Sequence, residues 1–167
     1  KELFHGRAVN FWTPTPWGVK RLKEGDRLYF MLKAPVRKVG GYGSFIRYLE
    51  MTAAEAWTTY GLGNGVDSQE ALVKKVNAFA EKRSKNFSHS DNPAIGCIEL
   101  ANVVTLDEDR FIDPIACGHS FPKEVVKLKY FNGDDGISAA LGTGTVAMKA
   151  YAIVEGVAKR RPSLRKD

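Results

Sequence analysis

Two consecutive helices set within a series of strands constrain the fold of this sequence most. Residues 52–61 begin with an N-cap threonine, carry Glu55 three residues later and end in glycine, which is typical of a short capped helix. Residues 67–84 predict a second helix with a capping box from Asp67 to Glu70. Its apolar stripe consists of Leu72, Val73, Val76, Phe79 and Ala80. Because no strand separates the two helices, the chain is not a regular βαβ repeat.

The strands are predicted from short apolar or alternating segments. Residues 8–12 form an apolar and aromatic run, residues 26–34 follow a Glu-Gly turn signal, and residues 42–51 alternate. We expect these three strands to pair in one sheet. Residues 94–106 are too apolar to alternate and predict a central strand, whereas the alternation in 124–131 predicts a strand with one face in water.

The predicted elements favour an α+β fold in which helices pack on a strongly curved sheet or small barrel. Residues 133–157 fit no single pattern, although 146–157 favour a closing helix. The last nine residues, 159–167, have the composition of a linker. We therefore expect one domain over residues 1–158, followed by a basic tail.

The net charge of +6 is distributed unevenly along the chain. Residues 1–51 contain ten basic and four acidic residues, residues 52–158 contain ten and fourteen, and the tail from Lys159 contains five and one. The charges of these three segments are +6, −4 and +4. A basic third beside an acidic middle predicts a positive face for a polyanion, and the alternative is a solubilising surface.

Localisation is inferred from two negative observations. No segment approaches the roughly 20 apolar residues of a membrane span, and the first ten residues lack the apolar stretch of a signal peptide. We expect a cytoplasmic protein with no membrane partner. The two cysteines, Cys97 and Cys117, are expected to be reduced and mostly buried.

Chemical motifs favour no catalytic or metal centre. His5, His89 and His119 lie far apart and form no His-x-x-x-His pair. Asp113, Cys117 and His119 fall within seven residues, which leaves a zinc site or a Cys–His nucleophile pair as minor alternatives. We therefore expect neither a metal nor a cofactor.

Aromatic residues crowd into the same part of the sequence as the basic excess. Ten of the eighteen lie between Phe11 and Tyr60. A strand ending in Trp12 and bending through two prolines to Trp17 would project rings at the rim of a sheet. The glycines of residues 40–45 would let the backbone approach a flat ligand closely. Aromatic walls, a close backbone and flanking cations suit a nucleobase held by stacking and by its phosphates.

Five ordered segments carry a resemblance to a known family. They read NFWTPTPW, EGDRLYFMLKAP, GGYGSF, AWTTYGLGNG and IGCIEL. In this order and at these separations, they resemble the N-terminal domain of bacterial EVE-type proteins of the PUA superfamily that are fused to an HNH nuclease. The resemblance covers Asn10 to about Tyr130. It implies a PUA-like β-barrel with flanking helices that flips a modified base into an aromatic pocket.

In the EVE-HNH proteins, the domain that this chain resembles is a reader of 5-methyl- or 5-hydroxymethylcytosine in DNA. It directs the nuclease of a modification-dependent (type IV) restriction endonuclease. The resemblance therefore implies DNA carrying modified cytosine as the partner. The implied base pocket comprises Trp12, Trp17, Gly41, Tyr42, Phe45 and Trp57. The basic residues expected along the DNA backbone are Arg21, Lys33, Arg37, Lys38 and Arg47.

Two departures from the family limit what the resemblance implies. The chain has no HNH motif, so we expect a reader without its own nuclease, and residues 159–167 would begin the connection to one. Residues 133–157 match the family poorly. Two other functions remain open: a PUA-like RNA-binding module, and a small nucleotide-acting enzyme that uses Cys117 and His119.

Overall fold

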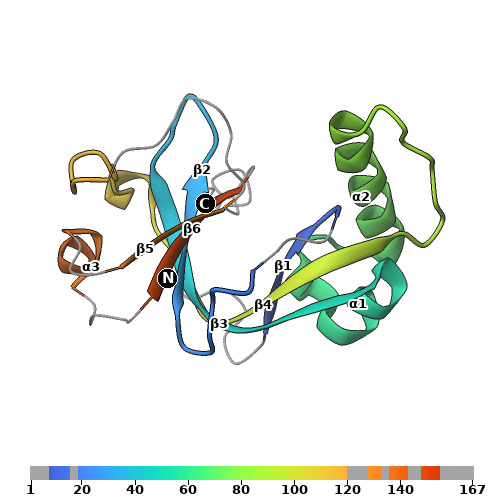
Figure 1. Ribbon diagram of the computed structural model, residues 1–167, viewed down its shortest axis with the longest axis horizontal. Helices are drawn as coiled ribbons and strands as arrows, with labels where there is room; N and C mark the ends of the chain where they lie inside the picture. The colour runs from blue at the N-terminus through green and yellow to red at the C-terminus, as the bar shows by residue number, and fades with distance from the viewer. Residues whose placement is uncertain (1–7, 16–18, 120–127, 133–135, 143–147, 155–167) are drawn as a thin grey trace, which may run out of the picture. The chain divides into compact units, whose positions relative to one another are not determined.

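The computed structural model describes residues 8–15, 19–119, 128–132, 136–142 and 148–154 (Figure 1). The chain divides into two compact units. The described residues of 4–24 and 45–102 form one of them, the helical unit. Those of 25–44 and 103–154 form the other, the hairpin unit.

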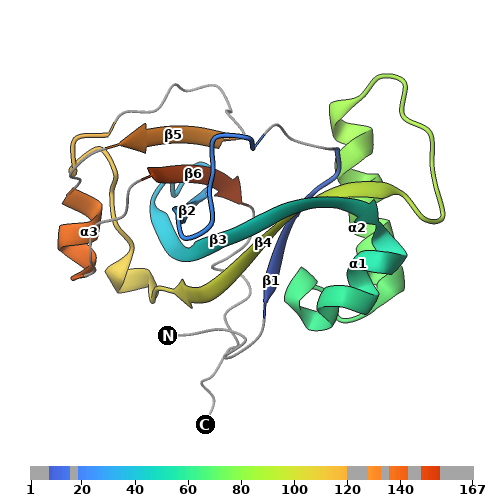
Figure 2. The ribbon, with the colours of Figure 1, turned by 60° about the horizontal axis from the view of Figure 1, so that its bottom comes forward.

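Six strands and three α-helices lie within the described ranges. The strands are β1 (Val9–Thr13), β2 (Arg27–Leu32), β3 (Val39–Thr52), β4 (Ala94–Thr105), β5 (Leu128–Asn132) and β6 (Met148–Val154). The helices are α1 (Ala53–Tyr60), α2 (Gln69–Arg83) and α3 (Gly136–Leu141), with short 3-10 turns at Gly61–Asn64 and Glu108–Arg110. The strands are hydrogen-bonded in the order β1-β4-β3-β2-β6-β5. The predicted α+β class with a strongly curved sheet is confirmed, and Figure 2 shows the curvature of β3 beside β2.

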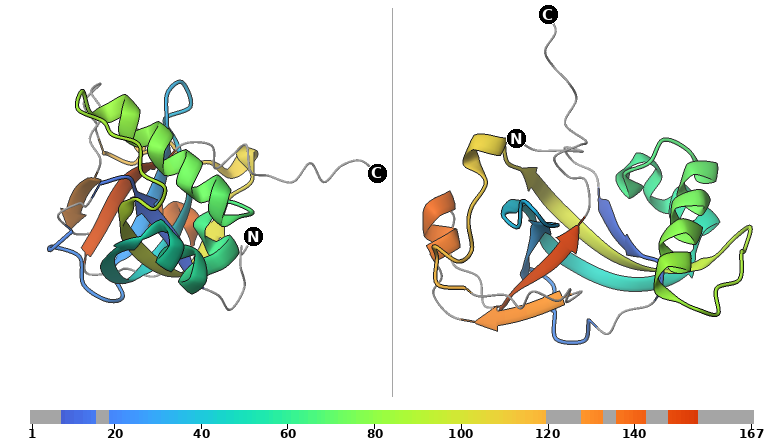
Figure 3. Two further views of the ribbon diagram at one scale, coloured as in Figure 1. Left: turned by 90° about the vertical axis from the view of Figure 1, so that its right-hand side faces the viewer. Right: turned by 90° about the horizontal axis from the view of Figure 1, so that it is seen from above.

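In the helical unit, α1 and α2 pack together against the strands (Figure 3). The core between them contains the fully buried residues Ala53, Ala56, Leu72, Val76, Ile95 and Cys97. The predicted N-cap threonine of α1 is confirmed, and it forms a capping box: Thr52 Oγ1 accepts from the Glu55 amide, and Glu55 Oε1 accepts from the Thr52 amide. This cap fixes the start of the helix directly after β3.

Helix α2 lies where it is predicted, but its N-cap differs. Ser68, not Asp67, has the extended backbone of a cap, and its hydroxyl accepts from the Ala71 amide at 3.0 Å. The predicted capping box between Asp67 and Glu70 is therefore wrong by one residue. The predicted stripe faces the core: Leu72 and Val76 are fully buried, and the other three members are partly buried.

The hairpin unit is built on β2, which pairs antiparallel with β3 and parallel with β6. Strand β5 then pairs antiparallel with β6. The predicted closing helix at 146–157 is wrong where the structure describes it, since β6 runs from Met148 to Val154. The alanines of this segment suit a helix, but pairing with β2 and β5 satisfies the backbone on both sides, so tertiary context overrides propensity.

The other strand predictions hold with changes of partner or length. Strand β1 pairs with β4 and not with β2 or β3, although all three predicted strands belong to one sheet. The predicted central strand is confirmed as β4, which lies between β1 and β3. The predicted strand at 124–131 is represented by β5, and its residues 124–127 lie outside the described part of the chain, as does the tail 159–167.

Two simpler expectations concern membranes and thiols. Among the described helices, none is long and apolar enough to cross a bilayer. Neither cysteine is in a disulfide: Cys97 is buried and Cys117 is half-buried.

Gly41 in β3 provides a test of the packing in the hairpin unit. A Cβ atom there would lie 2.5 Å from the Val104 carbonyl oxygen and 3.2 Å from the Phe30 ring. Because the Val104 carbonyl oxygen is part of the backbone of β4, it cannot move aside easily. We expect Gly41→Ala to lower the free energy of unfolding by about 2 kcal/mol, measured by urea denaturation.

The neighbouring glycine is the matched control for this substitution. A Cβ atom at Gly40 would meet only side-chain atoms of Leu32 and Phe111, at 3.2 Å or more. Gly40→Ala should therefore cost less than Gly41→Ala. An equal or smaller cost at Gly41 would contradict the close packing of β3 on β4.

Candidate nucleic-acid interface

The predicted base-pocket residues are divided between the two units. Trp12, Phe45 and Trp57 belong to the helical unit, whereas Gly41 and Tyr42 belong to the hairpin unit. Trp17 lies outside the described residues. Within the helical unit, Trp12 and Trp57 both pack against the same buried cluster. Gly41 and Tyr42 are therefore described separately from Trp12, Phe45 and Trp57.

Trp12 is held at the end of β1 by contacts on two sides of its indole ring. Its Nε1 atom donates to the Asn64 carbonyl oxygen at 3.0 Å, and its ring centroid lies 5.9 Å from that of Phe79 in α2. The side chain remains half-buried, not fully enclosed. Trp12 therefore has a fixed orientation and a partly accessible surface, which are the properties of a stacking platform.

Asn64, which accepts the hydrogen bond from Trp12, belongs to a buried amide network that the sequence does not reveal. Asn64 Nδ2 donates to the carbonyls of Ala56 and Gly61, and Asn64 Oδ1 accepts from Asn10 Nδ2 at 2.8 Å. Asn10 Nδ2 also contacts Cys97 Sγ at 3.3 Å. Only the position of Asn64 within the glycine-rich segment 61–65 hinted at a structural role, since it lies where a turn needs a side-chain partner.

Cys97 belongs to this network as a structural thiol. Burial raises the pKa of Cys97 to about 11, and the hydrogen bond from Asn10 opposes that shift only in part. A thiol with such a pKa is protonated at neutral pH and is a poor nucleophile or metal ligand. Within the described residues, no group of acidic, cysteine and histidine side chains is arranged to hold a metal ion.

Arg47, expected along the DNA backbone, is paired with an acidic residue in the helical unit. Its Nε atom donates to Glu99 Oε1 at 2.9 Å, and the Tyr60 hydroxyl donates to the same oxygen at 2.9 Å. The hydrogen bond and charge of Glu99 raise the pKa of Arg47, and burial raises that of Tyr60. The positive charge of Arg47 is therefore largely offset by its neighbour.

Tyr42 lies in an aromatic cluster of the hairpin unit. The Arg27 guanidinium lies 5.0 Å from the centroid of the Tyr42 ring, and Tyr29 contacts that ring edge-on at 6.2 Å. Tyr29 also stacks on Phe131 at 6.1 Å and shares a 3.0 Å hydrogen bond with Ser138. Tyr29 is fully buried, so this cluster is part of the core, whereas Tyr42 and Phe131 are half-buried.

The connection between β2 and β3 concentrates three of the five predicted backbone contacts. These residues, Lys33, Arg37 and Lys38, are named here the basic hairpin. Lys33 and Lys38 are exposed and Arg37 is half-buried. The connection is closed by a hydrogen bond from the Leu32 amide to the Lys38 carbonyl at 2.9 Å. Three cations are thus held on one six-residue connection, an arrangement that suits phosphate binding.

Arg21, the remaining residue expected along the DNA backbone, is exposed. It belongs to the helical unit, whereas the basic hairpin belongs to the hairpin unit. The structure therefore groups Lys33, Arg37 and Lys38 in one element and gives Arg47 an acidic partner. Of the predicted DNA track, the basic hairpin is the part assembled locally.

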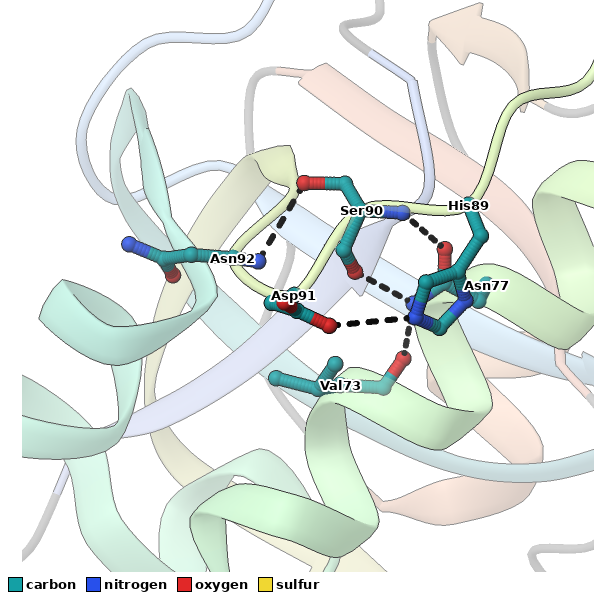
Figure 4. A network of polar contacts seen from close by, with 6 residues as sticks. All are labelled: Val73, Asn77, His89, Ser90, Asp91 and Asn92. Carbon is teal, nitrogen blue, oxygen red and sulfur yellow. Dashed lines mark hydrogen bonds and ion pairs between the residues drawn. The ribbon is translucent and has the colours of Figure 1, made fainter.

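An open groove of about 560 Å³ runs along α2 and the loop after it. Figure 4 shows how this loop is held: Asn77 bonds to the backbone of Ser90 and Val73, and His89 lies 3.3 Å from Asp91. The acidic residues lining the groove are Glu70, Glu81 and Asp91, against Lys74 and His89. This charge balance disfavours a polyanion, so the groove does not fit the nucleic-acid hypothesis.

The residues of the enzyme alternative lie in the hairpin unit. His119 packs its ring on Phe131 with a centroid distance of 4.6 Å, and Cys117 is half-buried beside Gly136. Asp113 Oδ1 accepts from the Ile115 amide, which makes the carboxylate part of a turn. These contacts give each side chain a packing or turn role.

Two described features bear on the nucleic-acid hypothesis, each in its own unit: the cations of the basic hairpin, and the half-buried indole of Trp12. Cations suit phosphate groups, and an indole ring suits the stacking of a flat base. Comparison of the chain with protein-family models, with curated proteins and with solved structures gives no match.

Proposed function

We propose that this chain is a DNA-binding reader of modified cytosine with a PUA-like fold. In this proposal it targets a modification-dependent restriction endonuclease whose HNH nuclease is covalently linked to it. The observation that carries the proposal is the basic hairpin, which gathers Lys33, Arg37 and Lys38 on one connection. Cations on a short connection are suited to contacts with the phosphates of a DNA strand, which supply affinity that is independent of sequence.

The reading of the base is assigned to stacking on Trp12. The substituent at carbon 5 of cytosine lies in the major groove, where a recognition helix is the usual reader. Neither long helix suits that role, since α1 carries no Lys or Arg and α2 borders an acidic groove. A base flipped out of the duplex and stacked on a fixed indole ring is the alternative that these residues support.

Trp12→Leu is expected to weaken binding to modified DNA by about 5- to 150-fold, because stacking of the one flipped base on a ring is worth about 1–3 kcal/mol. Leucine retains apolar contact with the cluster under Trp12. Much of the affinity for plain DNA should remain, because phosphate contacts supply it. Fluorescence anisotropy with the two duplexes measures both quantities.

Trp57→Leu is the matched control, since Trp57 packs against the same cluster from α1. Both variants should be compared at a temperature where circular dichroism shows them folded. Loss of discrimination in both variants, or equal loss of affinity for both duplexes in Trp12→Leu, would contradict the assignment of Trp12.

An RNA-binding module would share the cations and the stacking ring. RNA of the same sequence, added to the same titration, separates the two functions. Tighter binding to that RNA than to modified DNA would replace DNA with RNA as the proposed ligand.

A further inference from the structure

The β2–β3 connection has an apolar tip between its basic residues. Three consecutive residues, Ala34, Pro35 and Val36, are exposed and are named here the apolar tip. Val36 is 42% exposed and is one of only three large apolar side chains exposed to this degree within the described residues. Lys33 precedes the tip and Arg37 follows it. The connection thus presents an apolar projection that is flanked directly by cations.

The tip is mounted on a well-anchored base. Leu32 and Val39, at the two ends of the connection, are buried, and the Leu32 amide donates to the Lys38 carbonyl. Within the connection, the Val36 amide donates to the Lys33 carbonyl at 3.1 Å. Pro35 restricts the backbone of the tip further. The position of Val36 relative to the cations is therefore fixed by the hairpin.

We infer that the apolar tip is a wedge that enters the base stack of duplex DNA while Lys33 and Lys38 hold the flanking phosphates. This inference rests on the proposed function and adds a device to it. A flipped base leaves its neighbours unstacked, and proteins that deform DNA insert apolar side chains between base steps at such places. Val36 would occupy the space between the bases and stabilise the opened duplex.

Duplex DNA fits this tip better than a lipid surface does. Anchoring in a bilayer depends on the apolar area inserted, and it commonly uses aromatic or leucine side chains together with cations. The apolar tip offers only one side chain larger than proline. A wedge between base steps needs only one such side chain, placed at a fixed distance from the phosphate contacts.

The test is Val36→Ser in the full chain, with Ile115→Ser as the control. Ile115 is 70% exposed in the same unit but has no basic residue next to it in the sequence. Each variant is titrated with two duplexes carrying 5-methylcytosine, opposite guanine in one and opposite a non-pairing base in the other. A mismatch lowers the cost of opening, so the wedge matters less there.

We expect Val36→Ser to weaken binding to the paired duplex about tenfold and binding to the mismatched duplex about threefold or less. Ile115→Ser should leave both unchanged. The same ratio of paired to mismatched affinity in Val36→Ser and the unaltered chain would overturn the wedge. So would binding of the unaltered chain to phosphatidylserine vesicles that Val36→Ser abolishes while both duplex affinities stay the same.

Failure of the proposed function has a different signature in the same experiment. It would be seen as equal affinity of the unaltered chain for paired duplexes with and without the 5-methyl group. The wedge is judged from the ratio of paired to mismatched affinity, which does not depend on that comparison.

Discussion

Replacement of Asn64 by alanine is expected to lower the free energy of unfolding by about 3 kcal/mol, because the substitution removes three hydrogen bonds from a buried network. The carbonyls of Ala56 and Gly61 and the amide of Asn10 would each lose a hydrogen bond now made at 2.8–3.0 Å. Asn64 is 2% exposed, so water does not replace these bonds readily. Urea denaturation of the variant measures the loss.

The control for this prediction is an asparagine on the surface. Asn86 is exposed, and Asn86→Ala should change the unfolding free energy by less than about 0.5 kcal/mol. If Asn64→Ala lowers the free energy of unfolding as little as Asn86→Ala does, the buried amide network does not stabilise the helical unit.

Removing two charges from the basic hairpin is expected to have the largest effect on DNA binding. Lys33→Gln together with Lys38→Gln should weaken binding to modified and plain duplexes alike, because phosphate contacts do not depend on the base. The slope of log affinity against log salt concentration should become shallower by about two, one for each lost contact. Titrations at several salt concentrations give this slope.

Lys74→Gln together with Lys85→Gln is the matched control for charge. Both lysines are exposed, and both lie in the helical unit. The net charge of this variant equals that of the hairpin variant, but its salt slope should stay close to that of the unaltered chain. Equal slopes for the two double variants would show that the basic hairpin is a solvated surface and not a phosphate-binding element.

Sequence predicts best the elements whose signals are local. The capping box of α1 needs only Thr52 and Glu55, three residues apart, and the structure has both hydrogen bonds. Strand β4 is predicted from a segment too apolar to alternate, as expected of a strand with neighbours on both sides. In both cases the residues that carry the signal lie within the element itself.

Elements decided by distant partners are predicted less well. Residues 148–154 read as a helix, yet they form β6 because β2 and β5 lie on either side of them. The pairing of β1 with β4 joins segments separated by two helices, and no local pattern indicates it. Ser68 replaces Asp67 as a cap because both residue types cap helices well and the backbone angles decide between them.

The candidate site divides in the same way. Sequence alone indicates the cations of the basic hairpin and the indole of Trp12 as candidates. The hairpin lies in a segment with an excess of basic residues, and Trp12 lies at the end of a predicted strand. The pairing of Arg47 with Glu99 and the close packing of Gly41 on Val104 join residues more than 50 positions apart. These contacts give Arg47 and Gly41 structural explanations that sequence alone did not provide.

The most direct test of the proposed function is one titration of the unaltered chain. Duplexes of identical sequence carry cytosine, 5-methylcytosine or 5-hydroxymethylcytosine at a single position, and RNA of that sequence is included. We predict that a modified duplex binds at least about fivefold more tightly than both the plain duplex and the RNA, because in this proposal only the modified base is flipped and gains the stacking energy of about 1 kcal/mol or more. Equal affinity for all three duplexes would contradict the proposal that this chain reads modified cytosine.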